Sequence, residues 1–259
     1  MPRTFLATIQ FDGTDFVGWQ RQRVGRTVQD EVEAVLERLA GQAVRGHAAG
    51  RTDAGVHALG LGVSFALPDR WTPDALRRAM NALLPGDCFV ADVRETRPGF
   101  QARRCAIERQ YRYLIGSDPA SRSPFRHPFE WALGKELDVD RLRAAAARIE
   151  GQHDFKAFSV RRSVRPHTRC EVREARWTER SGGWGASFEI RADRYLHHMV
   201  RMLVGTMVDV SLDRRPLEDI DHLLAGKPGV TTSPPAPAAG LYFVTAVYPD
   251  EWFALPVAS

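Results

Sequence analysis

Apolar and polar side chains alternate along the first eleven residues, and the pattern then changes to a longer period. The alternation over residues 3–12 has a period of two, which predicts a half-buried β-strand. After Thr27 the apolar spacing becomes that of a helix and continues to Gly41. Thr27 is a typical N-cap and Gly41 a typical stop, so both ends of this helix are predicted. The apolar residues on one side of the predicted strand are Phe5, Ala7, Ile9 and Phe11.

The same two periods divide the rest of the chain into short strands and helices. This order resembles two split β-α-β units and predicts an α+β fold: a mostly antiparallel mixed sheet with helices on one side. Further strands are predicted at 43–48, 61–67, 88–93, 107–115, 168–178, 185–192 and 241–248. Further helices are predicted at 72–84, 138–149, 195–209 and 216–225.

A loop rich in Arg, Pro and Gly separates the two halves of this pattern. We therefore expect an N-terminal half, 1–105, and a C-terminal half, 106–259. The last strand, 241–248, is expected to return and pair near the first half. The two halves show no internal sequence repeat.

Composition is that of a soluble globular protein. The 259 residues are 44% apolar and 26% charged, with a net charge of +4. No apolar run reaches the ~20 residues of a membrane-spanning helix, and the first residues lack the apolar core of a signal peptide. Three widely spaced cysteines predict neither a disulfide framework nor a zinc site. We expect a reducing, cytoplasmic location.

The basic residues are almost all arginine, since only three of the 36 are lysine. Arginine presents a planar fork that fits phosphate and stacks on bases, which favours a nucleic-acid partner. A GC-rich genome would produce the same bias. Three arginine clusters stand out: Arg21, Arg23 and Arg26; Arg97, Arg103, Arg104, Arg109 and Arg112; and Arg161, Arg162, Arg165, Arg169 and Arg173.

The most informative stretch is Gly50-Arg51-Thr52-Asp53-Ala54-Gly55-Val56-His57-Ala58. Its aspartate stands between small residues beside a cation, so the carboxylate is exposed to a closely approaching ligand. Such a carboxylate can act as a nucleophile or a base. The structural alternative is a turn in which Asp53 bonds backbone amides and pairs with Arg51. The residues alone leave both interpretations open.

This string resembles the catalytic motif of the tRNA pseudouridine synthase A family, in which the aspartate is essential. The resemblance extends over nearly the whole chain. It is carried by Phe11-Asp12-Gly13-Thr14-Asp15-Phe16-Val17-Gly18-Trp19-Gln20, Arg109-Gln110-Tyr111-Arg112-Tyr113, Gly151-Gln152-His153-Asp154-Phe155 with Phe158, Tyr195-Leu196-His197-His198-Met199-Val200-Arg201 and Ala236-Pro237-Ala238-Ala239-Gly240-Leu241. The departures are Phe11, usually Tyr, and Asp193-Arg194, often Asn and a small residue.

The resemblance implies the pseudouridine synthase fold, with an RNA cleft on the sheet face opposite the helices. It implies isomerisation of uridine to pseudouridine at positions 38, 39 and/or 40 of the tRNA anticodon stem-loop, by a homodimer of such chains, without a cofactor. Asp53 would attack C1′ or assist its deprotonation. Arg51 and Arg201 would orient that carboxylate or help to displace the base, and Tyr111 would stack on uracil and transfer a proton. Substrate contacts are expected from Tyr111, Leu241, Arg21, Arg23, His57, Phe155, Arg161 and Arg165.

No metal site is expected, because His197 and His198 would diverge by ~100° on a helix. His57 invites a general-base interpretation, although a single loop histidine is more often structural. Two other classes of protein compete with the isomerase. A hydrolase with an aspartate nucleophile would need a second carboxylate or a metal cluster nearby. A non-catalytic RNA-binding protein would not need Asp53.

Overall fold

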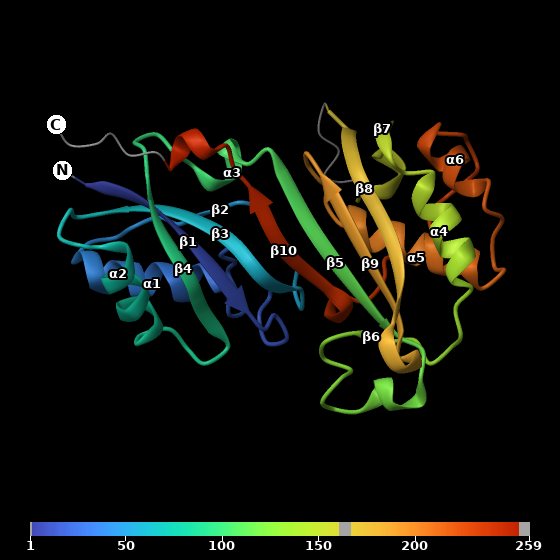
Figure 1. The fold of residues 1–259 in the computed structure, drawn as a ribbon, viewed down its shortest axis with the longest axis horizontal. Coiled ribbons are helices and arrows are strands. Elements are labelled where there is room, and N and C mark those ends of the chain that lie inside the picture. The colour runs from blue at the N-terminus through green and yellow to red at the C-terminus, as the bar shows by residue number, and fades with distance from the viewer. Residues whose placement is uncertain (1, 161–166, 254–259) are drawn as a thin grey trace. The chain divides into compact units, whose positions relative to one another are not determined.

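A computed structural model describes residues 2–160 and 167–253. The chain divides into two compact units, which are described separately below (Figure 1). Unit 1 contains residues up to Arg109 and the returning segment from Phe243, and unit 2 contains Gln110–Tyr242. The division thus follows Arg109, four residues after the expected one, and the last segment of the chain belongs to unit 1.

The sheet of unit 1 has the strand order β4-β1-β3-β10, with β2 paired to β3. Strand β1 is antiparallel to both β3 and β4. The predicted inward side of β1 is confirmed, because Phe5, Ala7, Ile9 and Phe11 are all buried. The bounds are β1 Arg3–Phe11, β2 His47–Ala48, β3 His57–Leu67, β4 Cys88–Thr96 and β10 Leu241–Val247.

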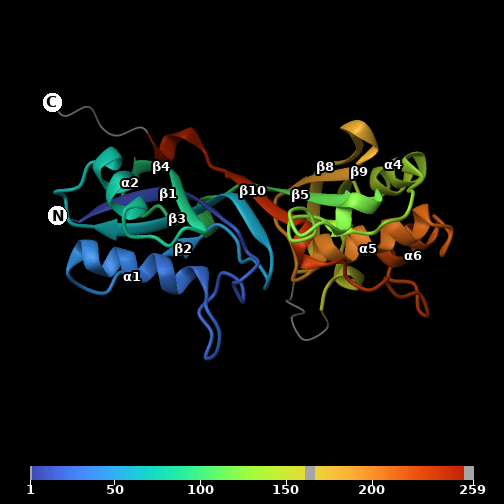
Figure 2. The ribbon, with the colours of Figure 1, turned by 90° about the horizontal axis from the view of Figure 1, so that it is seen from below.

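Helix α1 (Val28–Ala40) lies along one face of β1 and β3 (Figure 2). Its predicted ends are confirmed: the Thr27 hydroxyl accepts a hydrogen bond from the Asp30 N–H, and Gly41 takes a left-handed conformation with φ 77°. Helix α2 (Pro73–Asn81) packs on β4 and contacts α1. The short helix α3 (Ala102–Cys105) packs on β2 and β3.

Unit 2 is built on the strand order β5-β9-β8-β7, with β6 parallel to β5. The predicted hairpin is confirmed as β8 and β9, and Trp177 stacks on Phe188 across it with ring centroids 4.8 Å apart. Both side chains are fully buried and anchor the unit 2 core. The bounds are β5 Glu108–Gly116, β6 Trp131–Ala132, β7 Gly151–Asp154, β8 Arg169–Arg180 and β9 Gly185–Ala192.

Three helices complete unit 2. Helix α5 (Met199–Ser211) is buried along most of its length and lies against the strands (Figure 2). Helix α4 (Val139–Ala147) packs between α5 and β8, and α6 (Asp219–Leu224) contacts the turn at Lys156–Phe158. Within the described ranges, no helix is long and apolar enough to cross a membrane. The architecture confirms the predicted α+β class with mostly antiparallel pairing.

Three predicted elements begin four residues away from the predicted start. The helix expected from Tyr195 begins at Met199, because His198 takes a left-handed conformation with φ 63° that a helix cannot contain. The strand expected at 43–48 is reduced to His47–Ala48. In contrast, the strand expected from Leu61 starts at His57, so β3 begins directly after the Asp53 loop.

Helix α5 holds the proline-rich loop that precedes β10. A side chain at Gly205 would place its Cβ 2.2 Å from the carbonyl oxygen of Pro234, so the loop backbone lies directly on the helix there. The Ser233 N–H also donates to the Thr206 hydroxyl (3.3 Å). This contact fixes the loop that leads to Leu241.

We expect Gly205→Ala to destabilise the protein by about 1–3 kcal/mol, because the added methyl group must push two backbones apart. Helix propensity alone predicts the opposite sign, a gain of up to about 1 kcal/mol. Urea unfolding measures the difference. Gly86→Ala is the matched control, since nothing lies within 4 Å of its Cβ position. A Gly205→Ala variant as stable as Gly86→Ala would contradict the proposed contact.

Candidate active site

Asp53 lies on a loop of unit 1 whose backbone is held by the segment after β1. The Trp19 N–H donates to the Thr52 carbonyl (3.1 Å), and the Gly55 N–H donates to the Phe16 carbonyl (3.2 Å). Within the loop, the Val56 N–H donates to the Asp53 carbonyl (3.2 Å) and closes a turn. The Asp53 side chain is half-buried. Hydrogen bonds on both sides of Asp53 therefore fix the position of its backbone, from which the carboxylate extends.

Two glycines allow this close approach. Gly18 has φ +104°, and a Cβ there would lie 2.6 Å from the Thr52 carbonyl oxygen. A Cβ at Gly13 would lie 2.1 Å from the Val56 carbonyl oxygen. Neither position can hold a side chain without moving the Asp53 loop. The two motifs singled out in the sequence, 11–20 and 50–58, thus form one interlocked unit.

His57 links the segments 11–20 and 50–58 by a hydrogen bond and does not contact substrate. Only 2% of its side chain is exposed, and its Nδ1 accepts a hydrogen bond from the Gly13 N–H (3.0 Å). The Asp12 carboxylate lies 3.2 Å from the same nitrogen. An Nδ1 that accepts from a backbone amide leaves the proton of the neutral ring on Nε2. The expectation that His57 touches substrate is wrong because its ring is enclosed by protein.

Arg51 does not pair with Asp53 as expected. Its side chain is exposed, and it forms no ion pair with any residue that the structure describes. The neighbouring Thr52 is buried, and its hydroxyl has no hydrogen-bond partner among the described residues. The structural alternative for the loop was a turn in which Arg51 pairs with Asp53. The structure does not contain that ion pair.

Arg21 and Arg23 lie on an exposed loop that follows Trp19 in unit 1. Arg21 is held by α1, where it pairs with Asp30 and with Glu33 (3.1 Å). The hydrogen bond to Asp30 and the nearby carboxylates raise the pKa of Arg21. Arg23 is exposed and makes no ion pair within residues 2–160 and 167–253. Of the two predicted RNA contacts, Arg23 is the one whose charge is not neutralised by a neighbour.

In unit 2, Tyr111 and Tyr113 share one face of β5, as predicted. Tyr111 is 8% exposed and meets the Tyr195 ring edge-on, with centroids 4.8 Å apart and an interplanar angle of 77°. Tyr113 is fully buried, and its hydroxyl donates to the Pro237 carbonyl (2.7 Å). Burial raises the pKa of Tyr113, and the Arg201 charge opposes that shift. Tyr195 was given no role from the sequence, although its place in the 195–201 motif could have marked it as a candidate site residue.

Arg201 and Leu241 are brought to the same part of unit 2 by the loop between α6 and β10. The Arg201 Nε donates to the Ala236 carbonyl (2.7 Å), and the Ala236 N–H donates back to the Arg201 carbonyl (2.9 Å). Leu241 is 5% exposed, and Gly240 before it lies tightly against Tyr113. Unit 2 thus gathers a tyrosine pair, a cation and an apolar side chain from three distant segments.

Phe155 belongs to the core of unit 2 and does not touch substrate. It has no exposed surface and packs against Phe158 and His153. The expected contact is wrong because the ring is enclosed by protein, and α5 and α6 contact the turn Lys156–Phe158 that follows it. The predicted contacts Arg161 and Arg165 lie outside the described residues.

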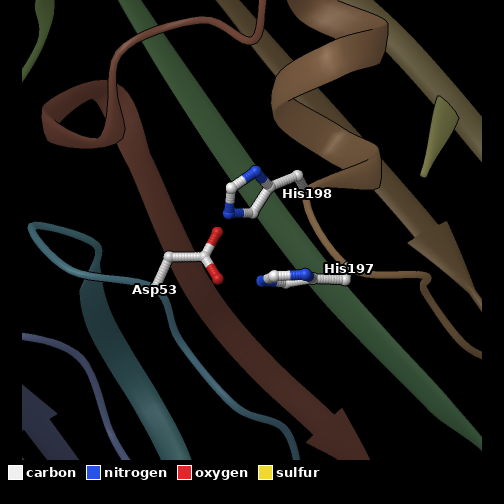
Figure 3. Close-up of side chains that lie close together, drawn as sticks. All are labelled: Asp53, His197 and His198. Carbon is white, nitrogen blue, oxygen red and sulfur yellow. The ribbon is translucent and has the colours of Figure 1, made fainter. Parts of the chain in front are cut away.

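His197 and His198 do not diverge on a helix. They precede α5, and their ring centroids are 4.2 Å apart. Figure 3 shows both rings on the segment that leads into α5, and Asp53 on the loop that precedes β3. The argument from helical geometry against a shared metal ion is therefore wrong, because the left-handed residue His198 lets both rings project together. The expectation of no metal site stays a prediction.

The three cysteines are free, and two of them are buried. Burial raises the pKa of both Cys88 and Cys170 to about 12, so neither thiol ionises near neutral pH. The structure therefore gives these two thiols no nucleophilic role.

Comparison with known proteins decides the family. The model of a tRNA pseudouridine synthase family matches residues 7–102 and 145–249. The chain belongs to this family. It is 40% identical to the tRNA pseudouridine synthase A of Thermus thermophilus, over 96% of this chain and 98% of that protein. It is 39% identical to the enzyme of the same name from Myxococcus xanthus, over 96% of this chain and 93% of that one.

The family match identifies the chain as a member of an isomerase family. Relatives of this chain are named as enzymes that make pseudouridine in tRNA. The matched ranges include the Asp53 loop, the segment that shapes it, and the unit 2 residues Arg201 and Leu241. The interlock between residues 13–19 and 52–57 fixes the Asp53 loop within the first matched range.

We expect Gly18→Ala to slow pseudouridine formation by about a hundredfold, because a displacement near 1 Å at a reacting group costs that much. The added methyl group must push Thr52 and Asp53 away. Steady-state turnover of tRNA measures the loss. Gly99→Ala is the control: its φ is +87°, so it carries the same backbone strain, but nothing lies within 4 Å. Equal activities for the two variants would rule out positioning by Gly18.

Proposed function

We propose that this chain isomerises uridines at positions 38, 39 and/or 40 in the anticodon stem-loop of tRNA. The observation that carries the proposal is Asp53, a half-buried carboxylate on a glycine-shaped loop, in a chain of this family. The non-catalytic alternative gives no reason for a rigid loop around that residue. A hydrolase would need a partner carboxylate, but of the two acids within residues 11–20, Asp12 faces His57 and Asp15 is exposed.

The reaction rearranges atoms within one nucleotide and consumes nothing. The N1–C1′ bond of uridine breaks, the uracil turns, a C5–C1′ bond forms, and the proton on C5 moves to N1. Asp53 either attacks C1′ to form an ester that the turned base displaces, or removes a sugar proton to form a glycal. Both routes need an ionised carboxylate within reach of the sugar. Both also need the target base outside its stack, which costs a few kcal/mol.

Unit 2 supplies the groups that act on the base. Tyr111 forms a T-shaped pair with Tyr195, which fixes the orientation of the ring that would stack on uracil. Its hydroxyl is the group that carries the proton between C5 and N1. Arg201 is fixed through Nε by the Ala236 carbonyl, which sets the direction of its guanidinium. Leu241 forms an apolar wall for the base.

The expected partner is tRNA, bound by shape and phosphate contacts from arginines such as Arg23. The proposed working form is a homodimer in the cytoplasm, acting without a cofactor. An L-shaped tRNA is much larger than one chain of this size, which supports the use of two subunits. Arg161 and Arg165 remain proposed RNA contacts.

Asp53→Asn is expected to abolish pseudouridine formation and to keep tRNA binding, because the amide has the same shape without the charge. Mapping of pseudouridine in tRNA, together with a binding titration, checks both parts. Asp92→Asn, on the exposed side of β4, is the control for loss of one negative charge in unit 1. Substantial pseudouridine from Asp53→Asn would remove this residue from its role.

Tyr111→Phe is expected to bind tRNA normally and to lose about 10²–10⁴-fold in turnover, the usual contribution of a proton-transfer group. The ring still packs edge-on against Tyr195, so stacking is preserved. Single-turnover kinetics separate the two effects. Tyr242→Phe removes a hydroxyl that donates to the Phe129 carbonyl and serves as the control. Full activity in Tyr111→Phe would limit this residue to stacking.

A further inference from the structure

A second group of cations lies on unit 1, away from the Asp53 loop. Arg45 and His47 belong to the segment that forms β2, and Arg104 belongs to α3, which packs on β2. Ser64 joins the two elements: its hydroxyl accepts from the Ala102 N–H (2.9 Å) and donates to the His47 carbonyl (3.4 Å). These contacts hold Arg45, His47 and Arg104 in one region, which we call the β2 cluster.

The two arginines of the β2 cluster keep their charges uncompensated. Both are exposed, and neither forms an ion pair within the described part of the chain. Glu33, the acid that acts on His47, already has other partners: one carboxylate oxygen accepts from the Gly46 N–H and the Gln29 amide, and the other pairs with Arg21. On helix α2 of the same unit, by contrast, Arg77 and Arg78 both pair with Asp74.

The pKa of His47 responds to the charges of these two arginines. Its pKa is lowered first by partial burial and then by the positive charge of Arg45, with a smaller contribution from Arg104, and Glu33 opposes the shift. Beside it lies a cavity of about 370 Å³, lined by Arg45, His47, Ser64, Thr4 and Phe100 among others. An anion at this place would contact Arg45, would also be attracted by Arg104 outside the cavity lining, and would relieve their repulsion.

The β2 cluster is distant from Asp53 along the same strand. His47 pairs with Ser64, whereas the Asp53 loop enters β3 at His57. Seven residues of strand span roughly 23 Å at ~3.3 Å per residue. With ~3.4 Å of axis per nucleotide, the spacing in one strand of duplex DNA taken as an approximation for RNA, this equals about seven nucleotides. An RNA that reaches both places must therefore extend well beyond the target uridine.

We propose that the β2 cluster binds backbone phosphates of the tRNA at a site about seven nucleotides from the modified uridine. This inference rests on the proposed function and deepens it, because it adds a contact that a full tRNA makes and a minimal hairpin does not. RNA fits better than a small anion because the two arginines come from different elements and are both exposed, which suits a row of phosphates.

The test compares Arg45→Gln/Arg104→Gln with wild type on two RNAs: an intact tRNA, and a hairpin with fewer than about six nucleotides on either side of the target. For the tRNA, the slope of log affinity against log salt should fall by about 2 in magnitude, about 1 for each lost phosphate contact. For the hairpin, the slope and the turnover should not change. Thermal unfolding verifies that the variant is folded.

Arg77→Gln/Arg78→Gln is the matched control, since it removes the same charge from two ion-paired positions on α2 of unit 1. On tRNA, the salt slope of Arg45→Gln/Arg104→Gln must fall more than the salt slope of this control. An unchanged slope on tRNA, or an equal fall on both RNAs or in both variants, overturns the inference. So does a shift of the His47 ring resonances with inorganic phosphate alone while the tRNA slope stays constant, since the cluster would then be a small-anion site. Absence of pseudouridine from wild type would instead overturn the proposed function.

Discussion

The backbone contact between residues 13–19 and 52–57 determines where the Asp53 carboxylate lies in unit 1. A carboxylate on a free loop would sample many directions, and ordering it would cost about 1–2 kcal/mol per residue at the moment of reaction. Here the loop is already ordered when the chain folds. It is held by hydrogen bonds from the Trp19 and Gly55 N–H groups and by the close approach at Gly13 and Gly18. Because both glycines abut carbonyl groups, the loop cannot move inward without losing these bonds.

Unit 2 also contains a loop that is held in place, at residues 233–237. This loop contains three prolines, which have no backbone N–H to donate, so only a few hydrogen bonds are available to fix it. Three hydrogen bonds join this loop to α5, one from Ser233 to Thr206 and two between Ala236 and Arg201, while the Pro237 carbonyl accepts from the Tyr113 hydroxyl on β5. Arg201, the side chain proposed to act on the base, is therefore also an anchor of the loop. A residue with both duties cannot change direction independently of that loop.

Sequence patterns predicted what depends on neighbours in the chain. Helix α1 follows from its apolar period, its Thr27 cap and its Gly41 stop, all within fifteen or so residues. The start of α5 could not be predicted, because Leu196 continues the apolar period while His198 breaks the helix through its own backbone conformation. His57 and Phe155 were misjudged for a related reason: a motif shows that a residue matters, but only the fold shows whether it faces substrate or the interior.

Charge gives the clearest case of this limit. The sequence groups Arg97, Arg103, Arg104, Arg109 and Arg112 as one basic cluster. In the structure, Arg109 donates to the carbonyls of Ala106 and Arg103, and Arg112 pairs with Glu189 across the sheet of unit 2. Arg104 instead joins Arg45, which is almost sixty residues earlier, because Ser64 ties α3 to β2. An arginine already bonded to carbonyls or carboxylates has less to gain from phosphate than an unpaired one. Pairing within the fold, and not the number of arginines along the chain, therefore determines which of them can recognise RNA.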